Sequence, residues 1–471
     1  MSTTHVELRP GAYADSVALL QVSRLVADRT GIAAAQVAMA TALNVEVLTQ
    51  MGFAVPVEAT TNDLVVALRL EPDAPGDALE AALAAVATAL STRATAAGPA
   101  ETAPPRTTGS ALRATPDALA LVSVPGASAL VEAMDALDAG RDVMVFSDNV
   151  PVAHEVALKR TATERGLLVM GPDCGTAVVG GLGLGFANSC APGPVGVVAA
   201  SGTGCQQLLS LLDHAGVGVT HALGVGGRDL SAAVGGLSTR AAARRLDADA
   251  SVELIVVVSK PPAPDVAAAL ELFLADLDTP VELGLLGPGL PDLTAVAERV
   301  LARLDREVPD WPVVGRAEPR TQSGGVLHGL FVGGTLCTEA RLIAAEILAD
   351  EACAFTDFGD DDYTRGRAHP MIDPTLRLEA LDRAVADPRT GVVLLDVVLG
   401  HGAEPDPAAR LAPAVAGASR VVPVVLSVVG TAGDPQDLAG QVRALAAAGA
   451  EVHLSNAAAA RRAVSLLASG R

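Results

Sequence analysis

The sequence predicts an α/β protein in which a small α+β domain precedes three domains built on parallel sheets. Half of the residues are hydrophobic but only 2% are aromatic, so the cores must consist mainly of Ala, Val and Leu, as in parallel sheets covered by helices. Beyond the first quarter of the chain, short apolar runs alternate with amphipathic stretches. This alternation is typical of repeated βαβ units. A length of 471 residues allows three or four such domains.

Residues 1–92 predict the small α+β domain. The run SVALLQVSRLVADRTG has the spacing of an amphipathic helix, and NDLVVALRLEP (62–72) has the composition of a strand. A second helix is expected over 75–90. Residues 93–115 are rich in Ala, Thr and Pro and have no periodicity, so we expect a linker there.

Residues 116–192 predict a Rossmann-like domain. Its expected strands are ALALVSVPG (118–126), DVMVFSD (142–148) and LLVMGPDCG (167–175), and an amphipathic stretch follows each of the first two. Strands separated by helices of this length form parallel βαβ units.

Two further α/β domains are expected at 193–310 and 322–471. Each opens with an apolar strand, a loop of Gly, Ser and Thr, and a long helix. Each later contains a very apolar strand that ends in a polar turn, SKPP (259–262) in one and LGHGAEPD (399–406) in the other. The shared order indicates two domains of the same fold.

The charge balance excludes some partners. With 33 basic and 54 acidic residues the net charge is −21, which disfavours nucleic acid and anionic membranes, because both require a basic surface. The five cysteines form no CxxC pair, so neither a disulfide framework nor a structural zinc site is expected. The sequence shows neither a secretory signal nor a long apolar run, and we expect a cytoplasmic protein without membrane spans.

The two Gly/Ser/Thr loops are candidate phosphate sites. Each lies between a strand and the first turn of a helix, where free N–H groups and the helix dipole attract anions. The alternative is an ordinary helix cap without a ligand, since these residue types are also common caps. The candidate phosphate-binding residues are Ser201, Gly202, Thr203 and Gly204 in the first loop and Gly333, Gly334 and Thr335 in the second.

Several charged residues are candidates for binding an anionic substrate. Lys260, one of two lysines in the chain, ends a Val/Ile strand, where ligand groups gather in open α/β sheets. The alternative is a lysine that extends to the solvent at the sheet edge. Arg365, Arg367 and His369 follow an acidic run, and guanidinium groups bind carboxylates and phosphates.

The acidic run is a candidate Mg²⁺ site, because this cation prefers oxygen ligands. The run consists of Asp360, Asp361 and Asp362. The alternative for this run and the basic residues that follow it is a solvated loop with internal ion pairs.

Several motifs resemble succinyl-CoA synthetase. Resemblance to the α-subunit is carried by GPDCGT (171–176), PVGVVAASGTG (194–204) and GVGGRD (224–229). Resemblance to the carboxy-terminal domain of the β-subunit is carried by VLHGLFVGGTLCTEA (326–340) and the tail at 433–460. The fused order, the additional N-terminal module and TDFGDDDYTRGRAHPMIDP (356–374) together resemble FdrA-type proteins.

The resemblance implies more about the fold and the sites. It implies that the Rossmann-like domain is of the CoA-binding type, that two flavodoxin-like ligase domains follow, and that the helices after the two glycine loops direct their N-termini at one phosphate. It also implies a CoA pocket near Pro125, Gly126 and Cys174. For Cys174, a small buried thiol is the alternative to a reactive one.

One departure from the family affects the expected activity. The family's phosphate-carrying histidine would lie within 282–293, but this segment reads ELGLLGPGLPDL. No ATP-grasp domain is recognisable either. His401 lies in a GHGA sequence that superficially resembles the missing loop, but it follows a different strand.

The resemblance to FdrA-type proteins implies that this chain is a subunit of oxamate carbamoyltransferase, an enzyme of allantoin degradation and nitrogen metabolism. With its other subunits it would convert oxalurate and phosphate into oxamate and carbamoyl phosphate. Phosphate would be a substrate, Mg²⁺ a candidate cofactor, and CoA binding an open question. The alternatives are a subunit of an NDP-forming acyl-CoA synthetase and a non-catalytic scaffold. In either case we expect an oligomer.

Overall fold

The computed structural model describes residues 3–12, 14, 16–94, 105–318, 325–364 and 367–468. The chain divides into two compact units, Met1–Thr107 and Thr108–Arg471, and each is described by itself below. Among the described residues, no helix combines the length and the apolar character needed to cross a membrane.

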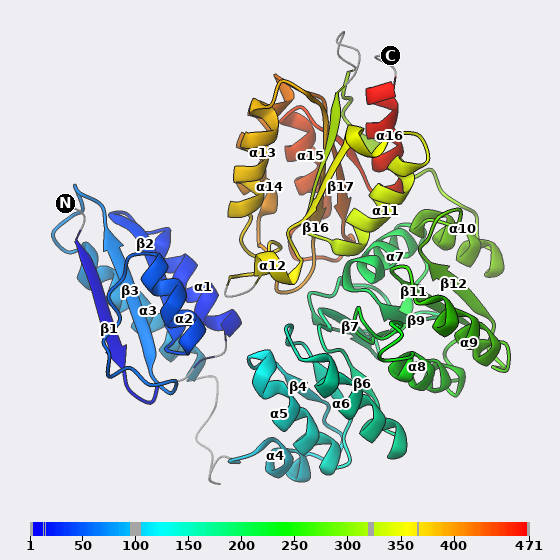
Figure 1. Cartoon of the computed structure of the whole chain (residues 1–471), viewed down its shortest axis with the longest axis horizontal. Coiled ribbons are helices and arrows are strands. Elements are labelled where there is room, and N and C mark those ends of the chain that lie inside the picture. Colours follow the sequence, from blue (N-terminus) through cyan, green and yellow to red (C-terminus); the bar gives the residue numbers. More distant parts are fainter. Residues whose placement is uncertain are drawn as a thin grey trace. The chain divides into compact units, whose positions relative to one another are not determined.

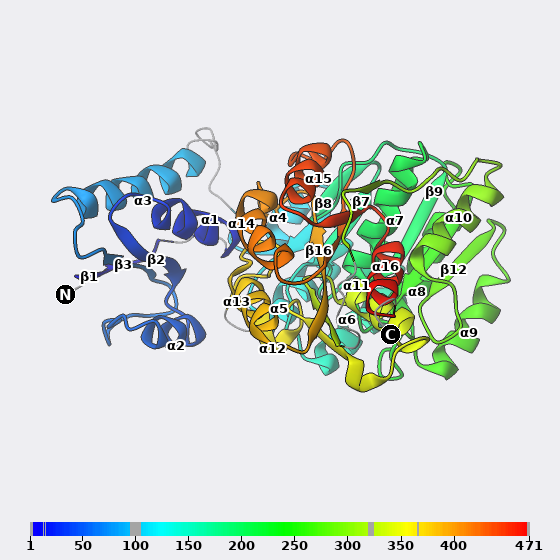
Figure 2. The ribbon, with the colours of Figure 1, turned by 90° about the horizontal axis from the view of Figure 1, so that it is seen from above.

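The first unit is a three-stranded antiparallel sheet covered on both faces. Its elements are β1 (Thr4–Arg9), α1 (Ser16–Ala27), β2 (Ile32–Met39), α2 (Ala42–Gln50), β3 (Leu64–Leu70) and α3 (Ala78–Ala94), with strand order β1-β3-β2. Helices α1 and α3 pack on one face and α2 on the other (Figure 2). The apolar run LVVAL of β3 is buried throughout, because the central strand of a doubly covered sheet has no solvent face.

The second unit begins inside the segment expected to be a linker at 93–115. Helix α4 (Thr108–Ala114) occupies its final part. The backbone N–H of Gly109 donates to the Asp135 carboxylate at 2.6 Å, and Leu112 is buried against the following helix. One buried leucine in two turns gives no visible periodicity, which is why the sequence pattern missed this helix. Residues 95–104 of the expected linker lie outside the described residues.

The next elements form a small parallel sheet of order β4-β5-β6. They are β4 (Ala120–Val122), α5 (Gly126–Asp138), β5 (Val143–Val145), α6 (Val152–Glu164) and β6 (Val169–Met170). The sheet ends earlier than the boundary expected at residue 192. The hairpin of β7 (Thr176–Val179) and β8 (Leu182–Gly185) joins the following sheet instead, where Val178 of β7 pairs with Ala222.

The two remaining sheets share one strand order. The first has order β12-β11-β9-β10-β7-β8, and the second has order β13-β18-β17-β16-β14-β15. In the second sheet the five parallel strands, numbered along the chain, follow the order 2-1-3-4-5 of flavodoxin-like folds. The four parallel strands of the first sheet follow the same order without a fifth strand. The duplicated pattern in the sequence thus corresponds to a duplicated topology.

The bounds of these elements are as follows. The first sheet and its helices comprise β9 (Val195–Ala200), α7 (Gly202–His214), β10 (Val219–Gly224), α8 (Leu237–Asp247), β11 (Leu254–Ser259), α9 (Pro264–Leu274), β12 (Val281–Leu285) and α10 (Leu293–Arg303). The second comprise β13 (Val313–Val314), β14 (Val326–Phe331), α11 (Gly334–Ala345), η1 (Asp350–Ala352), β15 (Cys353–Asp357), α12 (Asp361–Thr364), α13 (Thr375–Ala386), β16 (Thr390–Val398), α14 (Pro407–Ser419), β17 (Val424–Val429), α15 (Leu438–Ala447), β18 (Glu451–His453) and α16 (Asn456–Ala468).

Helices α7 and α11 join the two flavodoxin-like sheets. Each packs on its own sheet, and the two helices also pack on each other within one continuous hydrophobic core (Figure 1). Gln207 of α7 accepts a hydrogen bond from the Asn456 N–H at the start of α16, at 2.9 Å. Glu339, at the matching position of α11, accepts one from the Leu293 N–H at the start of α10, at 2.7 Å. Each of these hydrogen bonds links a helix of one flavodoxin-like domain to the start of a helix in the other. Together they fix the N-termini of α7 and α11 relative to each other.

Candidate functional site

The N-termini of α7 and α11 meet directly. The hydroxyls of Ser201 and Thr335 lie 2.6 Å apart, and both residues are buried. Ser201 also accepts a hydrogen bond from the Gly204 N–H at 2.9 Å, which caps α7. The loops after β9 and β14, which the sequence singled out separately, therefore form one site.

Both helix ends still offer N–H groups. Within the described part of the chain, the N–H groups of Gly202, Thr203, Gly334 and Thr335 have no hydrogen-bond acceptor. The first turn of a helix also carries a partial positive charge. Two such ends at one point favour an anion with several oxygen atoms, such as phosphate.

Lys260 lies at the start of α11 although it follows β11 of the other sheet. A Cβ atom added to Gly334 would lie 2.8 Å from Lys260 Nζ and closer still to the Asp357 carboxylate. Burial raises the pKa of Asp357, and the charge of Lys260 lowers it. The glycine thus leaves room for an ammonium group and a carboxylate at the end of the helix.

A buried carboxylate behind α11 was not predicted from the sequence. Asp396 of β16 accepts hydrogen bonds from the N–H groups of Val332 and Gly333, each at 2.8 Å, and Arg377 donates to it at 3.2 Å. Burial raises the pKa of Asp396 to about 6. The one available signal was an aspartate within the apolar run VVLLDVV.

His369 lies next to this site in its neutral form. Its ring packs on Phe186 with centroids 5.8 Å apart, and Nδ1 accepts a hydrogen bond from the Met371 N–H at 3.2 Å. Nε2 faces Gly359, two residues after Asp357, at 3.1 Å from an added Cβ atom. The surrounding protein lowers the pKa of His369 to about 4.

Of the two arginines predicted to act with His369, only Arg367 lies among the described residues. Arg367 is exposed, and among the described residues its side chain makes no hydrogen bond or ion pair with the helix ends. Arg365 lies outside the described residues.

The acidic run lies at the start of the short helix α12 and, among the described residues, does not form a cluster of metal ligands. Asp360 accepts a hydrogen bond from the Asp362 N–H at 3.0 Å, as a residue preceding the first turn of α12 does. Among the described residues no group of three or more His, Cys, Asp or Glu side chains could hold a metal ion. The structure therefore gives the expected Mg²⁺ site no set of protein ligands.

Further carboxylates border the site. Asp173 is exposed to solvent, and its pKa is raised by the surrounding protein and by the charges of Asp148 and Asp361. Lys260 and Arg228 act on it in the opposite direction. Asp173 is thus within electrostatic reach of Lys260.

The residues expected at a CoA pocket have close packing partners. Pro125 precedes the first turn of α5, and a Cβ on Gly126 would lie 2.6 Å from backbone atoms of Asn149. The Cys174 side chain is 2% exposed, and burial raises its thiol pKa to about 12. This supports the buried-thiol alternative for Cys174 over a nucleophile.

The GVGGRD stretch has a role that the sequence did not indicate. Asp229 and Glu155 both accept hydrogen bonds from the fully buried Lys159 ammonium, at 2.7 and 2.8 Å. Arg228 donates to the other oxygen of Glu155 at 3.0 Å. These residues connect α6 of the small parallel sheet to the loop after β10. Lys159 is therefore structural.

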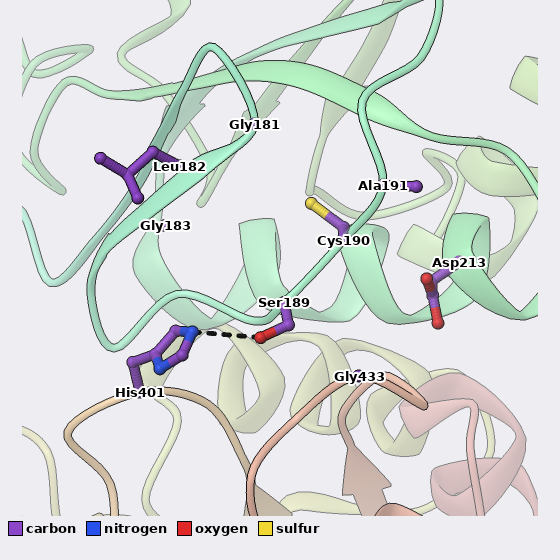
Figure 3. A pocket seen from close by; sticks show the side chains of 9 residues that line it. All are labelled: Gly181, Leu182, Gly183, Ser189, Cys190, Ala191, Asp213, His401 and Gly433. Atoms are coloured by element: carbon purple, nitrogen blue, oxygen red, sulfur yellow. Dashed lines mark hydrogen bonds between the residues drawn. The ribbon is translucent and has the colours of Figure 1, made fainter.

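His401, in the GHGA sequence, contacts the segment that follows β8. Its Nε2 atom pairs with the Ser189 hydroxyl at 3.0 Å, at the edge of a pocket of about 480 Å³ (Figure 3). In the segment 282–293, Asp292 caps α10 by accepting a hydrogen bond from the Ala295 N–H at 2.8 Å.

Comparison with known proteins decides the family. The model of the CoA-ligase family matches residues 330–466, and the model described as "AllF, heavy metal-associated domain" matches residues 1–105. The Escherichia coli K12 protein YahF, described as uncharacterized, is 36% identical over 94% of this chain and 95% of its own length. The chain belongs to the YahF family. The two family models and the similarities below support the FdrA-type resemblance of the sequence.

Part of the YahF-family chain is similar in sequence to alpha subunits of succinate–CoA ligases. Subunit alpha 2 of the ADP-forming succinate–CoA ligase of Archaeoglobus fulgidus is 28% identical over 34% of this chain and 56% of its own length. The solved ATP citrate lyase of Methanothrix soehngenii covers 44% of the chain at 19% identity, with a TM-score of 0.35. The match thus spans about half of the Archaeoglobus fulgidus ligase subunit.

The heavy-metal association of the N-terminal domain family has no matching soft-metal site among the described residues of this chain. Soft heavy metals prefer thiolate ligands, and residues 1–105 contain no cysteine. Among the described residues of this range no group of three metal-ligating side chains occurs either. The first unit of the YahF-family chain therefore matches this domain type but offers no cysteine ligand.

Proposed function

We propose that the junction of α7 and α11 binds phosphate, and that the chain is a subunit of a complex that transfers a carbamoyl group between a ureido acid, such as oxalurate, and phosphate. The observation that carries this proposal is the meeting of two helix N-termini at one point, with the Ser201 and Thr335 hydroxyls 2.6 Å apart and Lys260 beside them. The match to the AllF-type domain model supports a role connected with allantoin.

The reaction requires little more than these groups. A phosphate oxygen attacks the ureido carbonyl carbon, and the oxyanion that forms is stabilised by N–H groups and by the Lys260 ammonium. The C–N bond then breaks, and the leaving amide nitrogen takes the proton that phosphate releases. The products are carbamoyl phosphate and the amide. His369 accepts the Met371 N–H at Nδ1, so in the neutral ring Nε2 carries the proton and can donate a hydrogen bond to the substrate.

The same groups do not require a phosphorylated enzyme. A ligase of the family passes phosphate through a histidine, and the segment 282–293 contains none. Phosphorolysis uses free phosphate, so it needs neither this histidine nor a nucleotide. The missing histidine therefore favours transfer to phosphate.

An acyl-CoA ligase subunit is the second candidate, because the CoA-ligase family model matches residues 330–466. This candidate predicts a phosphohistidine after incubation with ATP or GTP and CoA. Carbamoyl transfer predicts none. Acid-labile phosphate on His401, measured by mass spectrometry, would favour the ligase.

The direct test is carbamoyl phosphate formation by the complex assembled with its partner subunits. Lys260→Met keeps the apolar stem and removes the charge. We expect it to raise the barrier by about 2.7–4 kcal/mol, which lowers turnover roughly a hundredfold to a thousandfold. Arg410→Met, which removes an exposed cation from α14, is the matched control and should leave the rate unchanged.

Two results would contradict the proposal. Full activity of the Lys260→Met complex would show that Lys260 takes no part in the reaction and is a structural residue. Formation of acyl-CoA from CoA, nucleotide and a carboxylate by the wild-type complex would replace carbamoyl transfer with the ligase reaction. If the chain were a scaffold, substitutions at both glycine loops would be tolerated.

A further inference from the structure

A second pocket lies away from the helix N-termini. It has a volume of about 480 Å³ and is lined by the turn between β7 and β8, the segment 189–191, the end of α7, and the loops after β16 and β17 (Figure 3). Helix α7 has 13 residues, so its two ends are about 20 Å apart. The pocket at Asp213 is therefore separate from the proposed phosphate site.

One end of the pocket presents a fixed pair of hydrogen-bonding groups. Ser189 Oγ and His401 Nε2 lie 3.0 Å apart. The Asp434 carboxylate accepts the Ser189 N–H at 2.7 Å, and the Ala187 carbonyl accepts the His401 N–H at 3.0 Å. Gly400, with φ of +129°, permits this turn, because an added Cβ would lie 2.4 Å from the Phe186 carbonyl oxygen. The backbone holds the pair in place without a ligand.

The opposite end is negatively charged. Asp213, at the C-terminal end of α7, is half-buried and accepts one hydrogen bond from the Ala432 N–H at 3.2 Å. Burial raises its pKa, and the nearby Asp434 raises it further. The end of the helix dipole adds partial negative charge. Among the described residues that line the pocket, none is a lysine or arginine.

The middle of the pocket is less polar. The Cys190 side chain points into it between the two ends (Figure 3). Burial raises the pKa of this thiol to about 11, and Asp213 and Asp434 contribute to the shift, so the thiol stays protonated. Leu182, on the side of His401, also lines the pocket and is 67% exposed (Figure 3). A short aliphatic chain fits between the polar ends.

We propose that this pocket binds a small aliphatic primary amine that carries a polar oxygen atom. Its ammonium group would pair with the Asp213 carboxylate, and its oxygen would bind the Ser189–His401 pair. Asp213 has no ion-pair partner within the described ranges, and a ligand cation there would balance its charge and that of the helix end. This inference does not depend on the proposed carbamoyl transfer, because the pocket shares no lining residue with the phosphate site.

The chain contains a reporter for this site. Trp311 is its single tryptophan, and its ring lies 6.1 Å from the ring of His214, the neighbour of Asp213. Titration of the purified chain with aminopropanol should therefore change the tryptophan fluorescence in a saturable way. Propanediol, in which a hydroxyl replaces the ammonium group, is the matched probe and should bind at least about tenfold more weakly.

Variants separate the two ends of the pocket. Asp213→Asn should weaken aminopropanol binding at least about tenfold and remove its dependence on salt concentration. His401→Ala should weaken both probes. Asp276→Asn, which changes an exposed carboxylate on another face, should bind as the wild type does. Calorimetry gives the same constants independently of the fluorescence.

Three results would overturn the inference. The first is the absence of saturable aminopropanol binding by both methods. The second is equal binding of aminopropanol and propanediol, since the negative end would then play no part. The third is unchanged binding in both the Asp213→Asn and His401→Ala variants when circular dichroism shows that each is folded.

Discussion

The ends of α7 and α11 occupy equivalent places in two sheets of one topology, yet they are stabilised differently. Helix α7 is capped by the Ser201 hydroxyl, whereas α11 has no side-chain cap and is preceded by Gly333. Behind α11 lies the buried Asp396 carboxylate, which accepts the Val332 and Gly333 N–H groups. One end is thus capped by a neutral group and the other is backed by a negative charge.

The difference indicates a division of roles. A carboxylate behind α11 offsets part of its dipole, and Arg377 and Lys260 restore positive charge around it. At α7 the dipole remains unopposed apart from its hydroxyl cap. The same asymmetry recurs deeper in the helices, where Gln207 of α7 corresponds to Glu339 of α11. The duplicated fold therefore holds a site whose two halves are not interchangeable.

Removing the cation behind α11 should have the largest effect. Arg377→Met leaves Asp396 buried without its partner charge, and breaking such a pair costs about 3–5 kcal/mol. We expect the free energy of unfolding, measured by urea denaturation, to fall by this amount. Arg383→Met on the same helix removes an exposed ion pair with Glu379 and should cost at most about 1 kcal/mol. Equal effects of the two substitutions would contradict the asymmetry.

Glu339→Gln makes α11 resemble α7 at the matching position. Burial raises the pKa of Glu339 from 4.5 to about 7. Because the unfolded state loses this proton first, the stability due to the neutral carboxyl is present below pH 4.5 and is lost as the pH rises through about 7. The variant lacks this loss, so its stability relative to the wild type should rise over that range, by on the order of 3 kcal/mol.

The measurement is urea denaturation of both proteins at several pH values. Asp396 titrates in both and cancels in the difference. A stability difference that does not change between pH 4.5 and about 7 would show that Glu339 is ionised in the folded protein.

The smallest effect concerns the cap of α7. Ser201→Ala removes the acceptor of the Gly204 N–H and should cost about 0.5–2 kcal/mol. Thr335→Val leaves that cap in place and removes the hydroxyl that contacts Ser201, so its cost should be smaller. Thermal denaturation of the two variants checks the order. A larger loss for Thr335→Val would show that the contact between the helices matters more than the cap.

Much of the fold could be predicted from local patterns. The strand, loop and helix order of each sheet is visible because buried parallel strands are continuous apolar runs, such as LIVVVS in β11. The loops at Ser201 and Gly333 were visible for the same reason. The hairpin β7–β8 lies within the range 116–192 expected for the Rossmann-like domain but belongs to the next sheet, because the sheet that a strand joins depends on partners distant in the sequence. Helix α4 was missed because it carries one buried leucine.

The site was less predictable than the fold. Asp396 and Glu339 are single acidic residues in apolar surroundings, and only the folded chain shows that they hold helix ends. Lys159 and Lys260 look equally unusual in the sequence, but one is enclosed by Glu155 and Asp229 and the other lies at the helix junction. Such differences arise from contacts between sheets, which local spacing does not encode.

The central claim is that α7 and α11 form one phosphate site with Lys260, and binding of inorganic phosphate to the purified chain tests it most directly. Both helices belong to this chain, so no partner subunit is needed. We expect calorimetry to show one site per chain, and we expect Lys260→Met to weaken it about tenfold to a hundredfold, while Arg410→Met binds as the wild type does. Absence of phosphate binding, or equal binding by the wild type and Lys260→Met, would contradict the account.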